Sequence, residues 1–378
     1  MNLPGHILLL MDRLEEKNFQ AWAVGGCVRD ALLGKQPQDY DLCTDALPEQ
    51  TRELFGDFPL VLAGMKHGTV GVVTQAGVVE ITTFRTEGDY GDCRHPGWVR
   101  FVPTLRQDLA RRDFTVNAMA YNPKQGLCDP FGGRQDLVTG TLRAVGEPEK
   151  RFREDALRIL RGVRFSVTYR LTPEKETERA MLSLAPALES LARERVFAEL
   201  SKLLPPAKAE DFLRFKPVLT GAVEEFSNFS ETSRLPEDLP LRLAALLARG
   251  DARKAMTGLK APAALTGEVC FLAENLDISL ENPWELVAQY GKSQILRLLL
   301  LRQAFGLDPG PTQWESIPDV TLKNLAVSGK DLLELGYTPG KELGNVLKEL
   351  LFAVLQNRVP NEKPALLSLL SHPVFPKV

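Results

Sequence analysis

The sequence predicts a small α+β domain followed by a long all-α region. Alternating apolar patterns and Gly-containing turns fill the first ~140 residues. Helical periodicity begins near Glu147 and continues through the rest of the chain. The 378 residues are enough for two or three domains. Apolar residues make up 44% and charged residues 25%, which is ordinary for a globular protein.

The N-terminal region contains the strand signals. The segment from Gln20 to Val24 predicts a strand, two glycines turn the chain, and CVRDALLG predicts a short helix closed by Gly34. The segment from Thr69 to Arg85 predicts a β-hairpin, since a Gly-containing turn separates two β-rich runs. A polar loop is expected from Thr86 to Thr104.

The remainder is rich in amphipathic stretches typical of helices. Examples are EDALRILRGVRF, ARERVFAELSKLL, PLRLAALLARG and KELGNVLKELLFAVLQN. The stretch EEFSNFSETSRLPEDLP predicts a linker between helical units.

Charge and cysteine content narrow the functional classes. The net charge is −3, so any nucleic-acid site must be a local basic patch. The five cysteines form no CxxC pair, which favours reduced thiols in a cytoplasmic protein and disfavours disulfide or zinc-ribbon frameworks. No stretch approaches the ~20 apolar residues of a membrane span, and the N-terminal apolar run predicts an amphipathic helix. We therefore expect no membrane partner.

Two aspartates flank one tyrosine in PQDYDLCT. If this segment is a strand, Asp39 and Asp41 point to the same face, where like charges repel unless cations bridge them. Oxygen ligands of this kind suit Mg²⁺, together with substrate phosphates. The alternative is a solvated turn. The preceding GGCVRD favours the metal hypothesis, because Gly25 and Gly26 let a ligand approach the backbone and Arg29 adds a donor for phosphate.

A third carboxylate lies in the predicted hairpin. Glu80 stands among apolar residues, where burial would be costly unless the group is paired or bound to metal. It is a candidate catalytic residue and third ligand. The alternative is that Glu80 faces solvent on an edge hairpin.

The stretch RRDFTVNAMA joins charges to an apolar run. Arg112 could grip a triphosphate, Asp113 could contact a ribose hydroxyl, and Asn117 is a further nucleotide-binding candidate. The alternative is a helix start capped by Asp113.

In EDALRILRGVR, charged residues recur every third position. They are Asp155, Arg158, Arg161 and Arg164. On a helix, Asp155 and Arg158 would be surface neighbours, and an ordinary ion pair is the simplest interpretation. An Asp acceptor beside Arg donors would also match the adjacent amino donor and ring acceptor of cytosine or adenine. Uracil and guanine present the inverse pattern, so this pair would reject them.

Together, GGCVRD, DYD, RRDFTVNAMA and EDALRILRGVR resemble the class II tRNA nucleotidyltransferase/poly(A) polymerase family, and most closely its bacterial CCA-adding members. The four motifs follow the family's order and spacing. Further similar segments are CDPFGGRQDL, RERVFAEL, SGKDLLELG and VPNEKPALL. The resemblance implies a polymerase β-like head at residues 1–140, a helical neck at 141–204, a body at 205–310 and a tail at 311–378, in a seahorse-shaped molecule.

The resemblance also implies chemical roles. Asp39 and Asp41 would hold two Mg²⁺ ions for attack of a tRNA 3′-hydroxyl on the α-phosphate of CTP or ATP. Gly26, Arg29 and Arg112 would contact triphosphate and sugar, while Arg161 and Arg164 would support the nucleotide or orient the base-selecting pair of Asp155 and Arg158. The tail would bind the acceptor and T-arm of tRNA by shape. The loop from Thr86 to Thr104 resembles the segment that helps such enzymes switch from C to A.

Three alternatives share these motifs to different degrees. An enzyme that adds only A to tRNA ending in CC would carry all of them. A bacterial poly(A) polymerase usually has a basic, aromatic-containing Gly motif after the Asp pair, whereas this chain has LAGMKHGTVGV. A non-catalytic RNA-binding protein on the same scaffold is disfavoured by the intact Asp and Arg residues.

Overall fold

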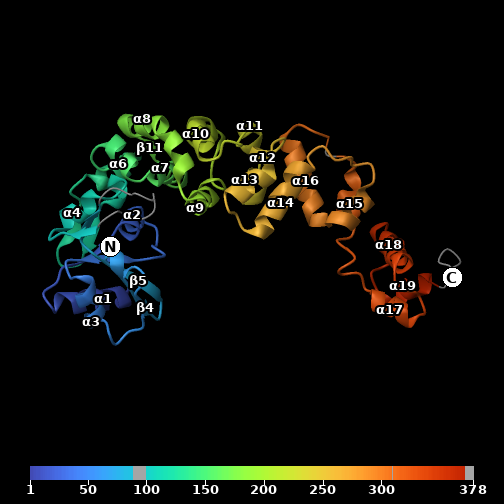
Figure 1. The fold of residues 1–378 in the computed structure, drawn as a ribbon, viewed down its shortest axis with the longest axis horizontal. Coiled ribbons are helices and arrows are strands. Elements are labelled where there is room, and N and C mark those ends of the chain that lie inside the picture. Colours follow the sequence, from blue (N-terminus) through green and yellow to red (C-terminus); the bar gives the residue numbers. More distant parts are fainter. Residues whose placement is uncertain (88–98, 309, 371–378) are drawn as a thin grey trace. The chain divides into compact units, whose positions relative to one another are not determined.

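The computed structural model describes residues 1–87, 99–308 and 310–370. The chain divides into two compact units, Met1–Glu224 and Glu225–Val378 (Figure 1).

A seven-stranded mixed sheet forms the base of the first unit, in the order β3-β4-β5-β2-β1-β8-β9. Its strands are β1 (Ala21–Val24), β2 (Asp41–Thr44), β3 (Leu60–Val61), β4 (Thr69–Thr74), β5 (Gly77–Thr83), β8 (Ala120–Asn122) and β9 (Gly126–Cys128). Only the β2–β5 pairing is parallel. The expected first strand and the β4–β5 hairpin are confirmed.

The sheet has one fully covered face. Burial alternates along β5, so that Val79 and Ile81 are buried while Val78 and Glu80 are exposed. Helices α1 (Gly5–Glu15) and α3 (Pro48–Leu54) pack against the sheet (Figure 1). The apolar stripe of α1 at Ile7, Leu10, Met11 and Leu14 is buried there.

The opposite face is covered only in part. Trp22, Val24 and Cys43 on this face pack against Leu105 and Leu109 of α4 (Leu105–Ala110). This second core ends at Asp41, the first residue of β2, which is exposed. The carboxyl group of Asp41 therefore lies where the covered part of the face gives way to open space.

The ends of the expected polar loop are ordered. Strands β6 (Arg85–Glu87) and β7 (Val99–Phe101) form an antiparallel ribbon, so the prediction of an irregular loop was wrong at its two ends. Arg85 pairs with Phe101, 16 residues further along the chain. Local sequence patterns do not reveal strand partners at this distance, so they predict a loop here. The DCRHPG centre of the loop lies outside the described residues.

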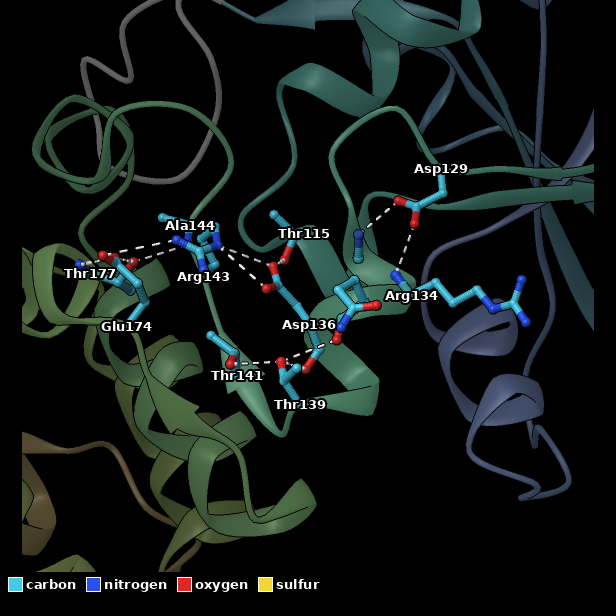
Figure 2. Close-up of polar contacts among 12 residues, drawn as sticks. Thr115, Asp129, Arg134, Asp136, Thr139, Thr141, Arg143, Ala144, Glu174 and Thr177 are labelled. Atoms are coloured by element: carbon cyan, nitrogen blue, oxygen red, sulfur yellow. Dashed lines mark hydrogen bonds and ion pairs between the residues drawn. The ribbon is translucent and has the colours of Figure 1, made fainter.

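The stretch CDPFGGRQDL joins the sheet to the helices that follow it. Figure 2 shows Asp136 between Thr115 and Arg143, with Thr115 donating a hydrogen bond at 2.7 Å and Arg143 at 3.3 Å. Arg143 also lies 3.9 Å from Glu174, which accepts a hydrogen bond from the backbone of Thr177 at 3.0 Å. Thr115 lies two residues after Asp113, so this network helps to fix the position of the segment that contains Asp113.

The rest of the first unit is helical. Its remaining elements are α2 (Gly26–Leu32), α5 (Gly133–Val138), α6 (Pro148–Glu154), α7 (Leu157–Tyr169), α8 (Lys175–Ser183), α9 (Arg193–Leu203), α10 (Ala209–Ala222), the short parallel pair β10 (Thr141–Leu142) and β11 (Thr172–Pro173), and the 3₁₀ turns Met65–His67, Thr115–Asn117 and Ala185–Ser190. Helices α7 and α9 pack along each other.

The described part of the second unit is all helix and loop. Its helices are α11 (Phe229–Thr232), α12 (Leu239–Leu247), α13 (Ala252–Gly258), α14 (Ala263–Glu274), α15 (Pro283–Tyr290), α16 (Lys292–Ala304), α17 (Gly329–Glu334), α18 (Lys341–Leu355) and α19 (Lys363–Leu369), with a 3₁₀ turn at Thr312–Ser316. A core that includes Val287, Ile295 and Leu350 holds α15, α16 and α18 together. The predicted α+β head with a helical remainder is confirmed.

Candidate active site

The two aspartates of DYD open into one large cavity of the first unit. The cavity has a volume of about 1030 Å³, and Asp39 and Asp41 are among its lining residues. The strand begins at Asp41, so the expectation that Asp39 is also in the strand was wrong. Asp39 lies in the irregular segment that leads into β2. Both side chains are exposed to the cavity.

Asp41 stands in a locally negative environment. Partial desolvation raises the pKa of its carboxyl group, and the neighbouring charges of Glu80 and Asp39 raise it further, against the opposing effect of Arg112. Carboxylates whose repulsion is incompletely compensated form a suitable oxygen-donor set for a hard divalent cation. Asp39 and Asp41 therefore fit the metal role that the sequence predicts.

Glu80 lies beside Asp41 on the neighbouring strand. In the β2–β5 register Leu42 pairs with Ile81, which places Asp41 and Glu80 next to each other on the same face. The side chain of Glu80 is exposed, and β5 lies between β4 and β2. Glu80 therefore faces solvent, as the alternative expected, but from an interior strand and not from an edge hairpin, and the expected burial was wrong because the face it occupies is uncovered. Among the described residues no three His, Cys, Asp or Glu side chains are grouped to hold a metal ion.

The glycine turn allows close approach of an arginine. Gly25 has φ +76°, and a Cβ at this position would lie 2.9 Å from Nη1 of Arg112. Helix α2 begins at the next residue. Gly25, Gly26 and Arg112 all line the cavity.

Arg29 is held rigidly by three different elements. It is 6% exposed and donates to Asp30 at 2.9 Å, to Asn117 at 2.6 Å and to the hydroxyl of Tyr169 at 2.5 Å. Its guanidinium also lies 4.1 Å from the centre of the Tyr169 ring. Asn117, a nucleotide-binding candidate, thus orients Arg29 in this structure.

Asp113 connects the sheet domain to α7. Its carboxylate accepts hydrogen bonds from Arg161 at 2.7 Å, from Asn117 at 3.2 Å and from the backbone of Phe114 at 2.8 Å. Burial alone would raise the pKa of Asp113, but Arg161 and these hydrogen bonds lower it to about 2. Asp113 lines the cavity and anchors Arg161 there.

The stretch EDALR does not form one continuous helix. Helix α6 ends at Glu154, Asp155 is extended with φ −147°, and α7 begins at Leu157. Asp155 accepts a hydrogen bond from the backbone N–H of Leu157 at 3.0 Å, which explains the break because the side chain caps the new helix.

Asp155 and Arg158 are not an ion pair. Arg158 instead contacts Glu154 at 2.9 Å and donates to the carbonyl of Arg111 at 3.0 Å, while Asp155 accepts from Arg195 at 3.1 Å. Both are buried, so the expected surface pair was wrong. Both still line the cavity, where an Asp acceptor and Arg donors remain within one wall.

Arg161 and Arg164 form the next turn of this wall. Glu199 of α9 contacts Arg164 at 2.6 Å and Arg161 at 3.9 Å. The guanidinium carbon of Arg164 lies 4.3 Å from the ring centre of Phe165, and that of Arg161 lies 5.3 Å from it. The electrostatic effect of Asp113 raises the pKa of Arg161 despite partial burial.

Several supporting residues were not predicted. Asp108 is fully buried and contacts Arg111 at 2.9 Å and Arg112 at 3.5 Å, so it holds the Arg pair. Arg111 and Arg112 follow Asp108 at i+3 and i+4, a spacing that indicates ion pairs on a helix and could have identified Asp108 from the sequence. Arg195 and Glu199 lie within RERVFAEL, a segment similar to the family, but no local sequence pattern connects them to Asp155 or Arg164.

The cavity is strongly basic overall. Its lining contains ten Lys and Arg residues against five Asp residues. A cavity that combines two exposed carboxylates with an excess of cations suits a polyanion bound together with a divalent cation. In this way the structure brings together all the predicted site residues except Glu80, which lies beside Asp41 on the adjoining strand.

Comparison with known proteins agrees with this geometry. Residues 21–143 match the poly A polymerase head domain, residues 170–214 the probable RNA and SrmB-binding site of polymerase A, and residues 241–370 the putative tRNA nucleotidyltransferase domain 2. The CCA-adding enzyme of Geobacillus stearothermophilus is 36% identical, covering 94% of this chain and 93% of the relative. This chain belongs to the CCA-adding enzyme family.

Other members of the CCA-adding enzyme family are similarly related. That of Levilactobacillus brevis is 34% identical over 95% of each chain. The crystal structure of the Bacillus stearothermophilus CCA-adding enzyme in complex with CTP matches with a TM-score of 0.76 and 32% identity, covering 98% of this chain and 97% of the other. The predicted family and enzyme class, tRNA nucleotidyltransferase, are confirmed. Over the described residues no helix is long and apolar enough to cross a lipid bilayer.

Proposed function

We propose that this protein adds C, C and A without a nucleic-acid template to the 3′ end of tRNA, using CTP and ATP and releasing pyrophosphate. The observation that carries the proposal is a basic cavity whose lining includes Asp39, Asp41, Asp155 and Arg158. CCA-adding relatives at 34–36% identity over most of their length support the same reaction.

Asp39 and Asp41 would hold the Mg²⁺ ions. Two such ions would activate the 3′-hydroxyl and stabilise charge on the transferring phosphoryl group. Glu80, whose charge already raises the pKa of Asp41, is retained as a candidate catalytic residue that strengthens the negative field at this position.

The nucleotide would lie along α7. Gly25 and Gly26 leave backbone accessible, while Arg29, Arg112, Arg161 and Arg164 would contact triphosphate and sugar. Asp113 and Asn117 would act mainly by orienting Arg161 and Arg29. Asp155 and Arg158 would select cytosine and adenine, since an acceptor beside donors matches both bases.

The finer organisation follows from this function. Residues 1–140 would form the catalytic head, 141–204 the neck that selects the base, 205–310 the body, and 311–378 the tail that binds the acceptor and T-arm. We place the protein in the cytoplasm, where the tRNA substrate is found.

The test uses two tRNA transcripts, one ending at the discriminator base and one ending in CC. Each is incubated with Mg²⁺ and all four nucleoside triphosphates, one of them labelled in each reaction, with Asp39→Asn as the inactive control. We expect two C and one A on the first transcript and one A on the second.

Other products would distinguish the alternatives. Extension of only the CC transcript would indicate an A-only enzyme. Long A tracts would indicate a poly(A) polymerase. Absence of Mg²⁺-dependent incorporation by the wild-type protein would refute nucleotidyl transfer.

A further inference from the structure

The active-site cavity extends beyond the residues assigned above. Its volume of about 1030 Å³ is at the upper limit of the roughly 300–1000 Å³ of small-molecule sites. Lys35, Thr168, Tyr169 and Lys202 line it as well. None of them is needed to hold the metal ions or to read the base.

These residues lie at the end of the cavity farthest from the base-selecting pair. Arg158, Arg161, Arg164 and Thr168 follow one face of α7 at helical spacing. At 1.5 Å per residue, Tyr169 lies about 16 Å along the axis from Arg158. The cavity therefore runs the length of α7, with base selection at its start.

Helix α9 runs in the same direction beside α7. Arg195 near its start contacts Asp155, and Glu199 in its middle contacts Arg164. Lys202, near the end of α9, therefore lies toward the end of α7 that contains Thr168 and Tyr169. Its side chain is exposed.

Lys35 reaches the same end from the sheet domain. Helix α2 starts next to the strand position of Asp41, since Val24 pairs with Asp41, and it leads away to a turn at Gly34. From Lys35 the chain returns to Asp39. The Lys35 ammonium lies 4.9 Å from the Tyr169 ring centre.

The two lysines differ from the arginines of the cavity. Arg29, Arg161 and Arg164 are held by carboxylates at 2.6–2.9 Å. In the described part of the chain, neither Lys35 nor Lys202 has a carboxylate partner within ion-pair distance, and the nearby Asp30 is engaged by Arg29. A flexible ammonium suits a phosphate that moves, whereas a fixed guanidinium suits one that must be held still.

We infer that Lys35 and Lys202 form an exit site for the leaving pyrophosphate, an inference that rests on the proposed function. The RNA 3′-oxygen forms a bond to the α-phosphorus, and the bond from that phosphorus to the bridging oxygen breaks. The electron pair leaves with pyrophosphate, and the hydroxyl proton passes to water. The lysines receive the pyrophosphate beyond Arg29 and reduce its rebinding at the reaction centre.

The test compares Lys35→Ala/Lys202→Ala with wild type in the reverse reaction, in which pyrophosphate removes the terminal A of tRNA ending in CCA. We expect the KM for pyrophosphate to rise about tenfold or more. The KM values for CTP and ATP in the forward reaction should change less than threefold, and the choice of base should not change.

Two further variants are matched to this one. Lys35→Arg/Lys202→Arg should restore most of the pyrophosphate affinity, because the charge remains. Lys175→Ala removes an exposed lysine of α8 outside the cavity and should behave as wild type. An unchanged KM for pyrophosphate, or an equal rise in the KM for CTP, would overturn the inference.

Calorimetric titration of inorganic pyrophosphate with Mg²⁺ separates this inference from the proposed function. If wild type adds no nucleotide, the proposed function fails. Tighter pyrophosphate binding by wild type than by the double alanine variant would still show that the two lysines form a pyrophosphate site, whereas equal binding would refute the inference even if nucleotides are added.

Discussion

The carboxylate of Asp155 accepts a hydrogen bond from Arg195, on a different helix, and forms no ion pair with the guanidinium of Arg158, three residues further along. Arg158 contacts Asp155 through the backbone, where its N–H donates to the carbonyl oxygen of Asp155 at 3.1 Å. Asp155, the carboxylate that we propose selects the base, is therefore oriented by a residue of α9. A hydrogen bond to a charged group is worth about 1.5–3 kcal/mol, enough to affect which edge of a base Asp155 can meet.

Arg195→Ala should therefore weaken base selection. Incorporation of U and G relative to C should rise about tenfold, while Arg195→Lys should retain most of the selectivity. Single-nucleotide incorporation on the discriminator-ended tRNA measures the ratio. Arg193→Ala, which removes a nearby arginine of α9 that donates to Ala222, is the control. Equal losses for all four nucleotides would show that Arg195 is only structural.

Removing the selecting pair should have a larger effect of the same kind. Asp155→Ala with Arg158→Ala should relax base choice toward U and G more than it slows overall transfer. The same incorporation assay measures both quantities. If the rates for all four nucleotides fall together, the pair does not read the base.

Removing the charge of Glu80 should change the pH dependence of activity. Glu80 contributes to the raised pKa of Asp41, so Asp41 takes up its proton at a higher pH than an ordinary aspartate as the pH falls. In Glu80→Gln that pKa decreases, and the acid limb of the kcat profile moves to lower pH. The kcat profile is measured from about pH 4 upward, so that it includes the region just above the ordinary Asp pKa of about 3.9. Glu49→Gln on α3 is the control, and an acid limb that moves to higher pH would contradict the expectation.

Asp113 should stabilise the fold in a pH-dependent manner. Its pKa is lowered to about 2 from an unfolded value near 3.9, which corresponds to about 2–3 kcal/mol at neutral pH. Because the pKa is lower in the folded state, the ionised Asp113 stabilises the fold at pH values above the unfolded pKa. This stabilisation is lost as the pH falls from the unfolded pKa toward the folded pKa. Asp113→Asn should thus lower the free energy of unfolding at pH 7, with a smaller difference from wild type below pH 4. Urea unfolding at several pH values measures this, and a pH-independent difference would argue against the charge.

Gly133 should tolerate no side chain. A Cβ there would lie 2.1 Å from the carbonyl oxygen of Thr115, so backbone must move. We expect Gly133→Ala to lower the free energy of unfolding by about 1–3 kcal/mol and to reduce activity, since Thr115 supports the segment of Asp113. Gly5→Ala, with open space around its Cβ position, is the control for thermal and urea unfolding. Unaltered stability of Gly133→Ala would show that the contact relaxes freely.

The sequence by itself determined the two-part architecture and most of the site. Periodicity predicts helices and strands because it reports which face of an element is buried. Short motifs were enough to predict several site residues, because the residue types and their spacing indicate metal and phosphate binding. These residues are Asp39, Asp41, Arg29, Arg112 and Arg158.

Only the tertiary structure decided how these residues are held. The contacts of Arg195 with Asp155 and of Glu199 with α7 join segments about 35–40 residues apart in the chain. The break at Asp155 and the uncovered position of Glu80 likewise depend on how the elements pack. Local patterns cannot report them, because burial and hydrogen-bond partners are set when the helices and the sheet pack together.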